Sequence, residues 1–153
     1  MRWLPLTGAA VVLDWYSSRR RVITSPIRVA IADDHALFRG GLKSLLFLQA
    51  DVRVVAELEH TTDLLLVLEQ TRCDVLLADL EMEWRALCDF EAIAERVPLI
   101  VMTITERPEE WLGLIRARAR RVVFKRFAVE TLMTASRAVA DGQLWIPPPP
   151  YRP

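Results

Sequence analysis

The stretch that decides the fold is IRVAIADD, residues 27–34, in which a mainly apolar run stops at Asp33 and Asp34. A second apolar run, residues 75–78, stops in the same way at Asp79. Short and nearly continuous apolar runs are typical of buried parallel strands, and such sheets place their ligand sites outside the carboxyl ends of the strands. The two runs therefore predict that three carboxylates lie in one crevice.

Crowded carboxylates repel one another and resist ionisation unless a cation joins them. A compact, highly charged site of oxygen ligands suits Mg²⁺, which proteins commonly hold with one or two carboxylates and a phosphate. We therefore expect Mg²⁺ as the cofactor of this crevice.

Two further strand ends carry groups that suit phosphate. The run 98–102 ends in Thr103, whose hydroxyl can donate to a phosphoryl oxygen. The run 122–124 is followed by Lys125, whose compact ammonium suits phosphate as a point charge. The chain has 18 arginines but only two lysines, Lys43 and Lys125, so a lysine at this strand end stands out from its background.

The sequence from residue 27 onward alternates between strand and helix patterns. Because parallel neighbours need right-handed crossovers, five strands alternating with five helices predict a doubly wound α/β fold with a five-stranded parallel sheet. Asp34 is the expected N-cap of the first helix, and Gly142 the expected end of the last. The expected strands are 27–32, 52–58, 75–79, 98–103 and 122–124, and the expected helices are about 38–46, 61–68, 84–95, 108–118 and 129–142.

Length and composition limit the class of protein. At 153 residues with 52% hydrophobic content, the chain is long enough for one domain with a sizeable core. A formal net charge of zero gives no overall attraction to nucleic acid or a membrane surface, and no apolar stretch reaches the ~18 residues that span a bilayer. Cys73 and Cys88 lack metal-ligand spacing and indicate reduced thiols. We therefore expect a cytoplasmic protein without direct DNA binding or membrane association.

Three segments divide the chain. Residues 1–26 predict a poorly ordered N-terminal extension, because their basic and apolar start lacks the small-residue cleavage site of a signal peptide. Residues 27–145 form the predicted domain. Residues 146–153 contain four consecutive prolines, which favour an extended polyproline II tail.

With these positions assigned, the chain resembles the receiver domain of a two-component response regulator, in the NarL/FixJ (LuxR-type) branch. The residues that carry the resemblance are 27–39, 74–80 and 138–145, together with Thr103 and Lys125. The resemblance covers about residues 27–147, and it is specific because the acid pair, lone acid, hydroxyl and lysine follow in order on four strands. It implies the flavodoxin-like (βα)5 receiver fold.

The resemblance implies a role for each acidic residue. Asp79 is the implied phosphoacceptor, which attacks a phosphohistidine of a partner and forms an aspartyl phosphate. Asp34 and Asp79 are implied to hold Mg²⁺, with Asp33 acting mainly through water and the backbone carbonyl of Glu81 as a further ligand. The implied partner is a sensor histidine kinase or a phosphotransfer protein, and a receiver homodimer is a further implied contact.

Lys125 and Thr103 complete the set of implied functional residues. Lys125 is expected to offset charge on the transferring phosphoryl group, after which Thr103 moves toward that group. The surface formed by strands 98–103 and 122–124 is then expected to switch between two conformations. The local change in charge favours one conformation over the other. Such a protein is a phosphoacceptor rather than a multiple-turnover enzyme.

The chain also departs from the family pattern. After Asp79 the family usually has Pro-Gly and a short turn, whereas residues 83–85 here are Glu-Trp-Arg. Arg118 and Arg121 stand where glycines are usual, and Val122 stands where an aromatic residue often reports phosphorylation. No helix-turn-helix pattern follows residue 145, so the expected protein is a stand-alone receiver.

Other interpretations stay open at this point. One is a degenerate receiver that binds partners without phosphorylation, which the altered loop and Val122 favour. Another is a small phosphatase, because Asp79 and Glu81 loosely resemble the acidic pairs of aspartate-nucleophile hydrolases. His35 is expected to be an ordinary first-turn helix residue and His60 a loop residue, because neither has a partner at metal-ligand spacing.

Overall fold

The computed structural model describes residues 25–84, 87–104, 113, 119, 121–125 and 129–143. Its strands are β1 (Ile27–Ala32), β2 (Val52–Leu58), β3 (Val75–Asp79), β4 (Leu99–Thr103) and β5 (Arg121–Phe124). Its helices are α2 (Ala36–Phe47), α3 (Leu64–Gln70), α4 (Leu87–Arg96) and α6 (Val129–Ala140), with a short 3₁₀ helix η1 (Thr61–Asp63) before α3.

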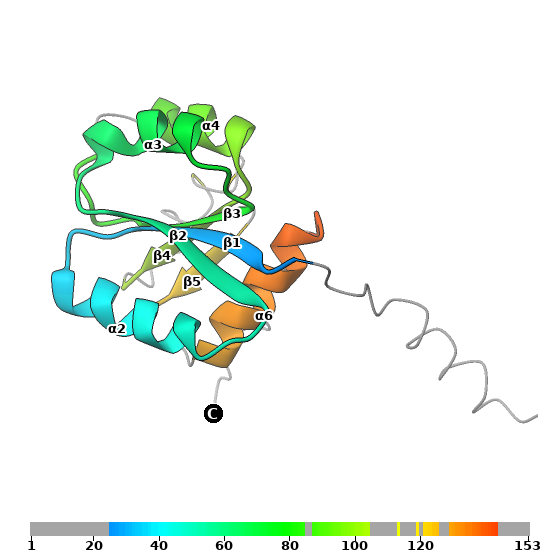
Figure 1. The fold of residues 1–153 in the computed structure, drawn as a ribbon. Coiled ribbons are helices and arrows are strands. Elements are labelled where there is room, and N and C mark those ends of the chain that lie inside the picture. The colour runs from blue at the N-terminus through cyan, green and yellow to red at the C-terminus, as the bar shows by residue number, and fades with distance from the viewer. Residues whose placement is uncertain are drawn as a thin grey trace, which may run out of the picture.

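The five strands form one parallel sheet in the order β2-β1-β3-β4-β5 (Figure 1). This is the flavodoxin-like order of a doubly wound fold, in which the chain reverses its direction across the sheet between β1 and β3. The predicted fold class is therefore confirmed.

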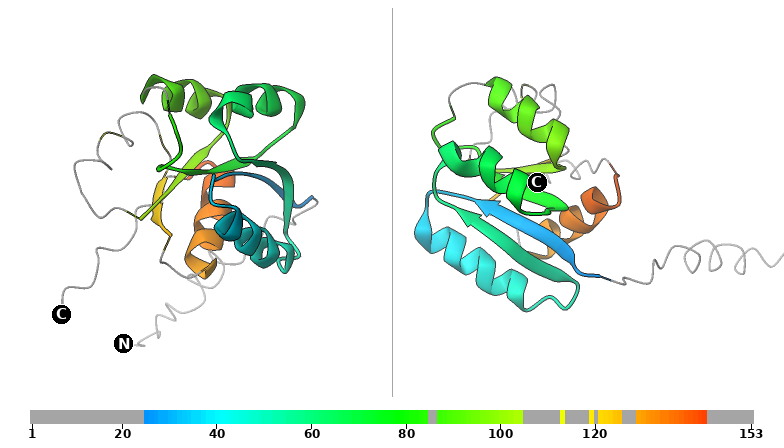
Figure 2. Two further views of the ribbon diagram at one scale, coloured as in Figure 1. Left: turned by 90° about the vertical axis from the view of Figure 1, so that its left-hand side faces the viewer. Right: turned by 45° about the horizontal axis from the view of Figure 1, so that its top comes forward.

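Helices cover both faces of the sheet, with α3 and α4 on one side and α2 and α6 on the other (Figures 1 and 2). Successive side chains of a strand point to opposite faces of the sheet. Thus β3 supplies Leu76 and Ala78 to the core beneath α3 and α4, and Val75 and Leu77 to the core beneath α2 and α6. All four side chains are fully buried. This burial on both faces explains why the strands read as continuous apolar runs.

The helix starts differ from the sequence expectations. Asp34 is not the N-cap of α2: that position belongs to His35, whose side chain makes no capping hydrogen bond. Asp34 instead turns its carboxylate toward the His35 ring. The third expected helix corresponds to α4, which is described from Leu87 onward and does not include Trp84. The Trp84 N–H donates to the Met82 carbonyl oxygen over 2.8 Å in a tight turn.

The end of α6 agrees with the sequence. Gly142 adopts a left-handed φ of 76°, which glycine reaches without the penalty of a Cβ atom. The N–H groups of Gly142 and Gln143 donate to the carbonyl oxygens of Val139 and Ala138, respectively. The last turn of the helix is thereby capped by the backbone.

Several expectations fall outside the described residues. They are the N-terminal extension up to residue 24, nearly all of the helix at 108–118, and the proline-rich tail. The domain boundaries at 27 and 145 stay predictions. No helix within the described part of the chain is long and apolar enough to cross a membrane.

Candidate functional site at the carboxyl edge of the sheet

Four strand ends bring the candidate residues to one edge of the sheet. Asp33 directly follows β1, Asp79 ends β3, Thr103 ends β4 and Lys125 directly follows β5. The backbone joins these ends, since the N–H of Leu80 donates to the Met102 carbonyl oxygen and that of Lys125 to the Thr103 carbonyl oxygen. The predicted convergence of the strand ends is confirmed.

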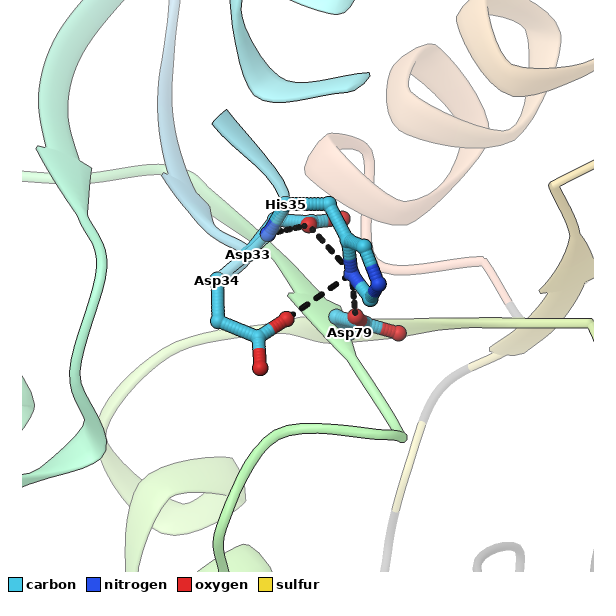
Figure 3. A group of neighbouring side chains, drawn as sticks. All are labelled: Asp33, Asp34, His35 and Asp79. Carbon is cyan, nitrogen blue, oxygen red and sulfur yellow. Dashed lines mark hydrogen bonds and ion pairs between the residues drawn. The ribbon is translucent and has the colours of Figure 1, made fainter. Parts of the chain in front are cut away.

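The acidic residues form a tight cluster. One ligand atom each from Asp33, Asp34, His35 and Asp79 lies within 4.8 Å of all the others (Figure 3). Asp33 and Asp79 are fully buried, whereas Asp34 lies at the exposed mouth of the cluster. A small cation that enters from solvent would therefore meet Asp34 first and the two buried carboxylates below it.

Lys125 faces the buried carboxylates from the β5 side. Its Nζ lies 2.7 Å from Asp79 Oδ2 and 3.0 Å from Asp33 Oδ2, and its side chain is only 9% exposed. Burial opposes the charge on Lys125, but the contacts with Asp79 and Asp33 outweigh it, so the pKa of Lys125 lies above its usual value. The ammonium also lies 4.7 Å above the centre of the Phe38 ring.

The carboxyl group of Asp79 is harder to ionise than that of an ordinary aspartate. Burial, with a further contribution from the nearby Glu81 side chain, raises the pKa of Asp79 from 3.8 to about 6, although Lys125 acts in the opposite direction. The carboxylate form therefore predominates only above about pH 6 until a further cation joins the cluster.

The donor set fits Mg²⁺. Two fully buried oxygens, Asp33 Oδ2 and Asp79 Oδ2, accept no hydrogen bond from the described residues, although Lys125 faces both as an ion pair. Buried carboxylate oxygens without hydrogen bonds are costly, and a hard divalent cation would satisfy them. Asp33, Asp34 and Asp79 are the side chains that could hold such an ion. That the Glu81 backbone carbonyl contributes a further ligand stays a prediction.

Thr103 and the Glu81 side chain are joined at the neighbouring strand end. Thr103 Oγ1 donates to Glu81 Oε1 over 2.8 Å, and the Ile104 N–H donates to the same oxygen over 3.1 Å. Burial acts to raise the pKa of Glu81, but hydrogen bonding with Asp79, Thr103 and Ile104 holds it below its usual value. Glu81 is therefore a charged neighbour of Asp79.

The altered loop after Asp79 folds back on the site. The Trp84 Nε1–H donates to the carbonyl oxygen of Asp79 over 2.9 Å, and the indole packs on Phe90 with 4.2 Å between ring centres. Thr61 also holds the loop by donating its hydroxyl to the Glu83 carbonyl oxygen. The loop formed by Glu83 and Trp84 is thus anchored to the backbone of Asp79 and to Thr61.

His35 is the site residue that the sequence analysis missed. The expectation of an ordinary first-turn helix residue is wrong, because Nδ1 of His35 lies 2.9 Å from Asp34 Oδ1 and 3.6 Å from Asp79 Oδ2. The only available signal was its position directly after Asp33 and Asp34, since the side-chain direction depends on the turn into α2. His60 is not part of the cluster.

Fold and site together define a doubly wound α/β protein with an acidic pocket and a facing lysine at the carboxyl edge of its sheet. Comparison with known families gives a match to the response regulator receiver domain over residues 29–137. The chain therefore belongs to the response regulator receiver domain family.

Individual relatives agree with this assignment. The chain is 31% identical over 121 residues to YxjL of Bacillus subtilis (strain 168), described as an uncharacterized transcriptional regulatory protein, covering 76% of this chain and 56% of YxjL. It is 31% identical over 122 residues to the nitrate/nitrite response regulator protein NarP of Escherichia coli (strain K12), covering 77% and 57%, respectively. The chain thus spans little more than half the length of these relatives.

A solved structure supports the same fold. The isolated REC domain of RcsB from Salmonella enterica serovar Typhimurium, determined in the presence of the phosphomimetic BeF3⁻, matches with a TM-score of 0.72 and 26% identity. The match covers 80% of this chain and 94% of that chain. The receiver fold and the NarL-type relatives expected from the sequence are both confirmed.

Proposed function

We propose that this receiver domain accepts a phosphoryl group on Asp79 from a sensor histidine kinase or a phosphotransfer protein in a Mg²⁺-dependent reaction. The observation that carries the proposal is the position of Lys125, whose ammonium contacts both Asp79 and Asp33. A lysine between two buried carboxylates offsets their charge and can stay beside Asp79 when an anionic phosphoryl group arrives.

The proposed step is a phosphoryl transfer. A carboxylate oxygen of Asp79 attacks phosphorus as the bond between phosphorus and the donor histidine nitrogen breaks, and that nitrogen keeps the bonding electron pair. When bound, Mg²⁺ supplies electrophilic stabilisation of the phosphoryl oxygens. Asp33 and Asp34 would hold the ion, Lys125 would neutralise charge on the phosphoryl group, and Thr103 would then donate its hydroxyl to a phosphoryl oxygen.

We further propose that the phosphorylated protein signals through protein contacts, with association of two receivers as one route, and without binding DNA itself. YxjL, which is described as a transcriptional regulatory protein, is aligned with this chain over 56% of its own length. We also propose that the protein is a cytoplasmic phosphoacceptor that is modified once per cycle, and not a multiple-turnover enzyme.

The proposal is tested by incubating the protein with acetyl phosphate and Mg²⁺ and measuring its intact mass. We expect one added phosphoryl group on the wild type, none on Asp79→Asn, and none when EDTA replaces Mg²⁺. Asp74→Asn is a matched control, because Asp74 forms a partly buried ion pair with Arg28 and lies outside the acidic cluster. A wild type without an adduct, or an Asp79→Asn variant with the wild-type adduct, would overturn the proposal.

One observation favours a second candidate, a partner-binding module that does not depend on phosphorylation. Val122 is 9% exposed and packs in the core beneath α3 and α4, so no aromatic ring is present at this position to report a change at Asp79. A partner that binds wild type and Asp79→Asn equally, with and without acetyl phosphate, would support the second candidate. A partner that discriminates between them would support phosphorylation-dependent signalling.

A further inference from the structure

His35 places an imidazole nitrogen atom close to the carboxylates of Asp33, Asp34 and Asp79. Its Nδ1 lies 2.9 Å from Asp34 Oδ1, 3.5 Å from Asp33 Oδ1 and 3.6 Å from Asp79 Oδ2, and Figure 3 shows the imidazole pointing at all three groups. The side chain is 64% exposed, so burial does not force this orientation.

These separations match those between two ligands of one metal ion. Ligands that each lie about 2.1 Å from a transition ion are about 3.0 Å apart at the right angles of an octahedron and about 3.4 Å apart in a tetrahedron. The three distances from His35 Nδ1 lie close to this range. An ion bound between the carboxylates would therefore have the imidazole nitrogen within reach with little rearrangement.

The backbone supports the same placement. The N–H of His35 donates to Asp33 Oδ1 over 2.8 Å, which fixes the turn that carries Asp33, Asp34 and His35 together. The buried oxygens Asp33 Oδ2 and Asp79 Oδ2 both face the Lys125 ammonium as ion pairs and accept no other hydrogen bond from the described residues. One ammonium does not balance three carboxylates, so the cluster can accommodate a further cation.

We propose that His35 is a nitrogen ligand and makes this pocket a site for divalent transition ions such as Mn²⁺ and Zn²⁺, in addition to Mg²⁺. Imidazole suits borderline transition ions, whereas Mg²⁺ prefers oxygen ligands and keeps its waters. His35 should thus strengthen transition-ion binding while leaving Mg²⁺ affinity nearly unchanged. The proposal rests on the metal site of the proposed function.

The test measures metal binding by calorimetry and nitrogen coordination by pulsed electron paramagnetic resonance of bound Mn²⁺, at one neutral pH. In the wild type we expect coupling of Mn²⁺ to a histidine nitrogen. His35→Gln should lose this coupling and bind Mn²⁺ and Zn²⁺ at least about tenfold more weakly, with Mg²⁺ affinity changed by less than about twofold. His60→Gln, which replaces the chain's other histidine, should behave as the wild type in every measurement.

Several outcomes separate failure of this inference from failure of the proposed function. Wild-type protein that binds Mg²⁺ and accepts a phosphoryl group but shows no nitrogen coupling would overturn the role of His35 alone. Unchanged or tighter Mn²⁺ binding by His35→Gln, with an unchanged unfolding curve, would overturn it as well. Protein that binds no Mg²⁺ even at millimolar concentration would instead overturn the metal site that both proposals share.

Discussion

Thr103 Oγ1 donates a hydrogen bond of 2.8 Å to Glu81 Oε1, so the end of β4 is tied to the second residue after Asp79. Thr103 can donate its hydroxyl proton to only one acceptor at a time. Donation to a phosphoryl group on Asp79 therefore requires that the hydrogen bond to Glu81 breaks. Glu81 would thus compete with the phosphoryl group for the Thr103 hydroxyl.

We predict that Glu81→Ala increases the rate of phosphorylation by acetyl phosphate. The substitution removes a negative charge beside Asp79 and the Glu81 acceptor of the Thr103 hydroxyl, and relief of roughly 1 kcal/mol corresponds to about a fivefold increase in rate. The measurement is the initial rate of adduct formation by mass spectrometry. Glu83→Ala, which removes an exposed charge two residues further on, should change the rate by less than about twofold. A slower Glu81→Ala variant would show that Glu81 assists the reaction.

We predict that Lys125→Met destabilises the metal-free protein by about 3 kcal/mol at neutral pH, because two buried carboxylates lose their positive partner. The free energy of unfolding in urea with EDTA measures this loss. Added Mg²⁺ should recover part of it, since the ion supplies positive charge to the same carboxylates. Lys43→Met is the matched control: Lys43 is half exposed and pairs with Glu57 at the surface, so its loss should cost less than about 1 kcal/mol. Equal effects of the two substitutions would contradict the prediction.

The raised pKa of Asp79 predicts a pH-dependent difference between wild type and Asp79→Asn. Because its pKa in the folded protein is about 6 rather than 3.8, Asp79 stabilises the fold while it is protonated, and this contribution is lost as pH rises through 6. Asparagine stays neutral and loses nothing. In EDTA, the stability of Asp79→Asn relative to wild type should therefore rise by ~2 kcal/mol between about pH 4 and pH 7. Urea unfolding at several pH values measures the difference, and a constant difference would contradict the raised pKa.

Trp84 should report metal binding, because its indole N–H donates to the Asp79 carbonyl oxygen. We predict that Mg²⁺ changes the tryptophan fluorescence of the wild type, and that Trp84→Phe abolishes most of this change. The substitution keeps the packing on Phe90 and removes one hydrogen bond, at a cost of about 1 kcal/mol. Trp145→Phe should keep the response, whereas Asp34→Ala should lose it together with metal binding. A full response in Trp84→Phe would assign the signal to another tryptophan.

Sequence alone was sufficient for the strand framework. The runs that became β1 and β3 are recognisable because a strand buried on both faces must be apolar at every position, which is a local property. Their end points also predicted that Asp33 and Asp79 would meet, since the carboxyl ends of parallel strands share one edge.

Only the tertiary structure decided how the side chains beyond those strand ends are used. Asp34 was expected to cap α2, but its carboxylate faces His35, and His35 was expected to be unremarkable, but its ring points into the acidic cluster. Glu81 bonds to Thr103 across 22 positions of sequence. The physical reason is that apolar periodicity fixes where the backbone is buried, whereas the direction of a polar side chain in a turn depends on groups that distant segments bring beside it.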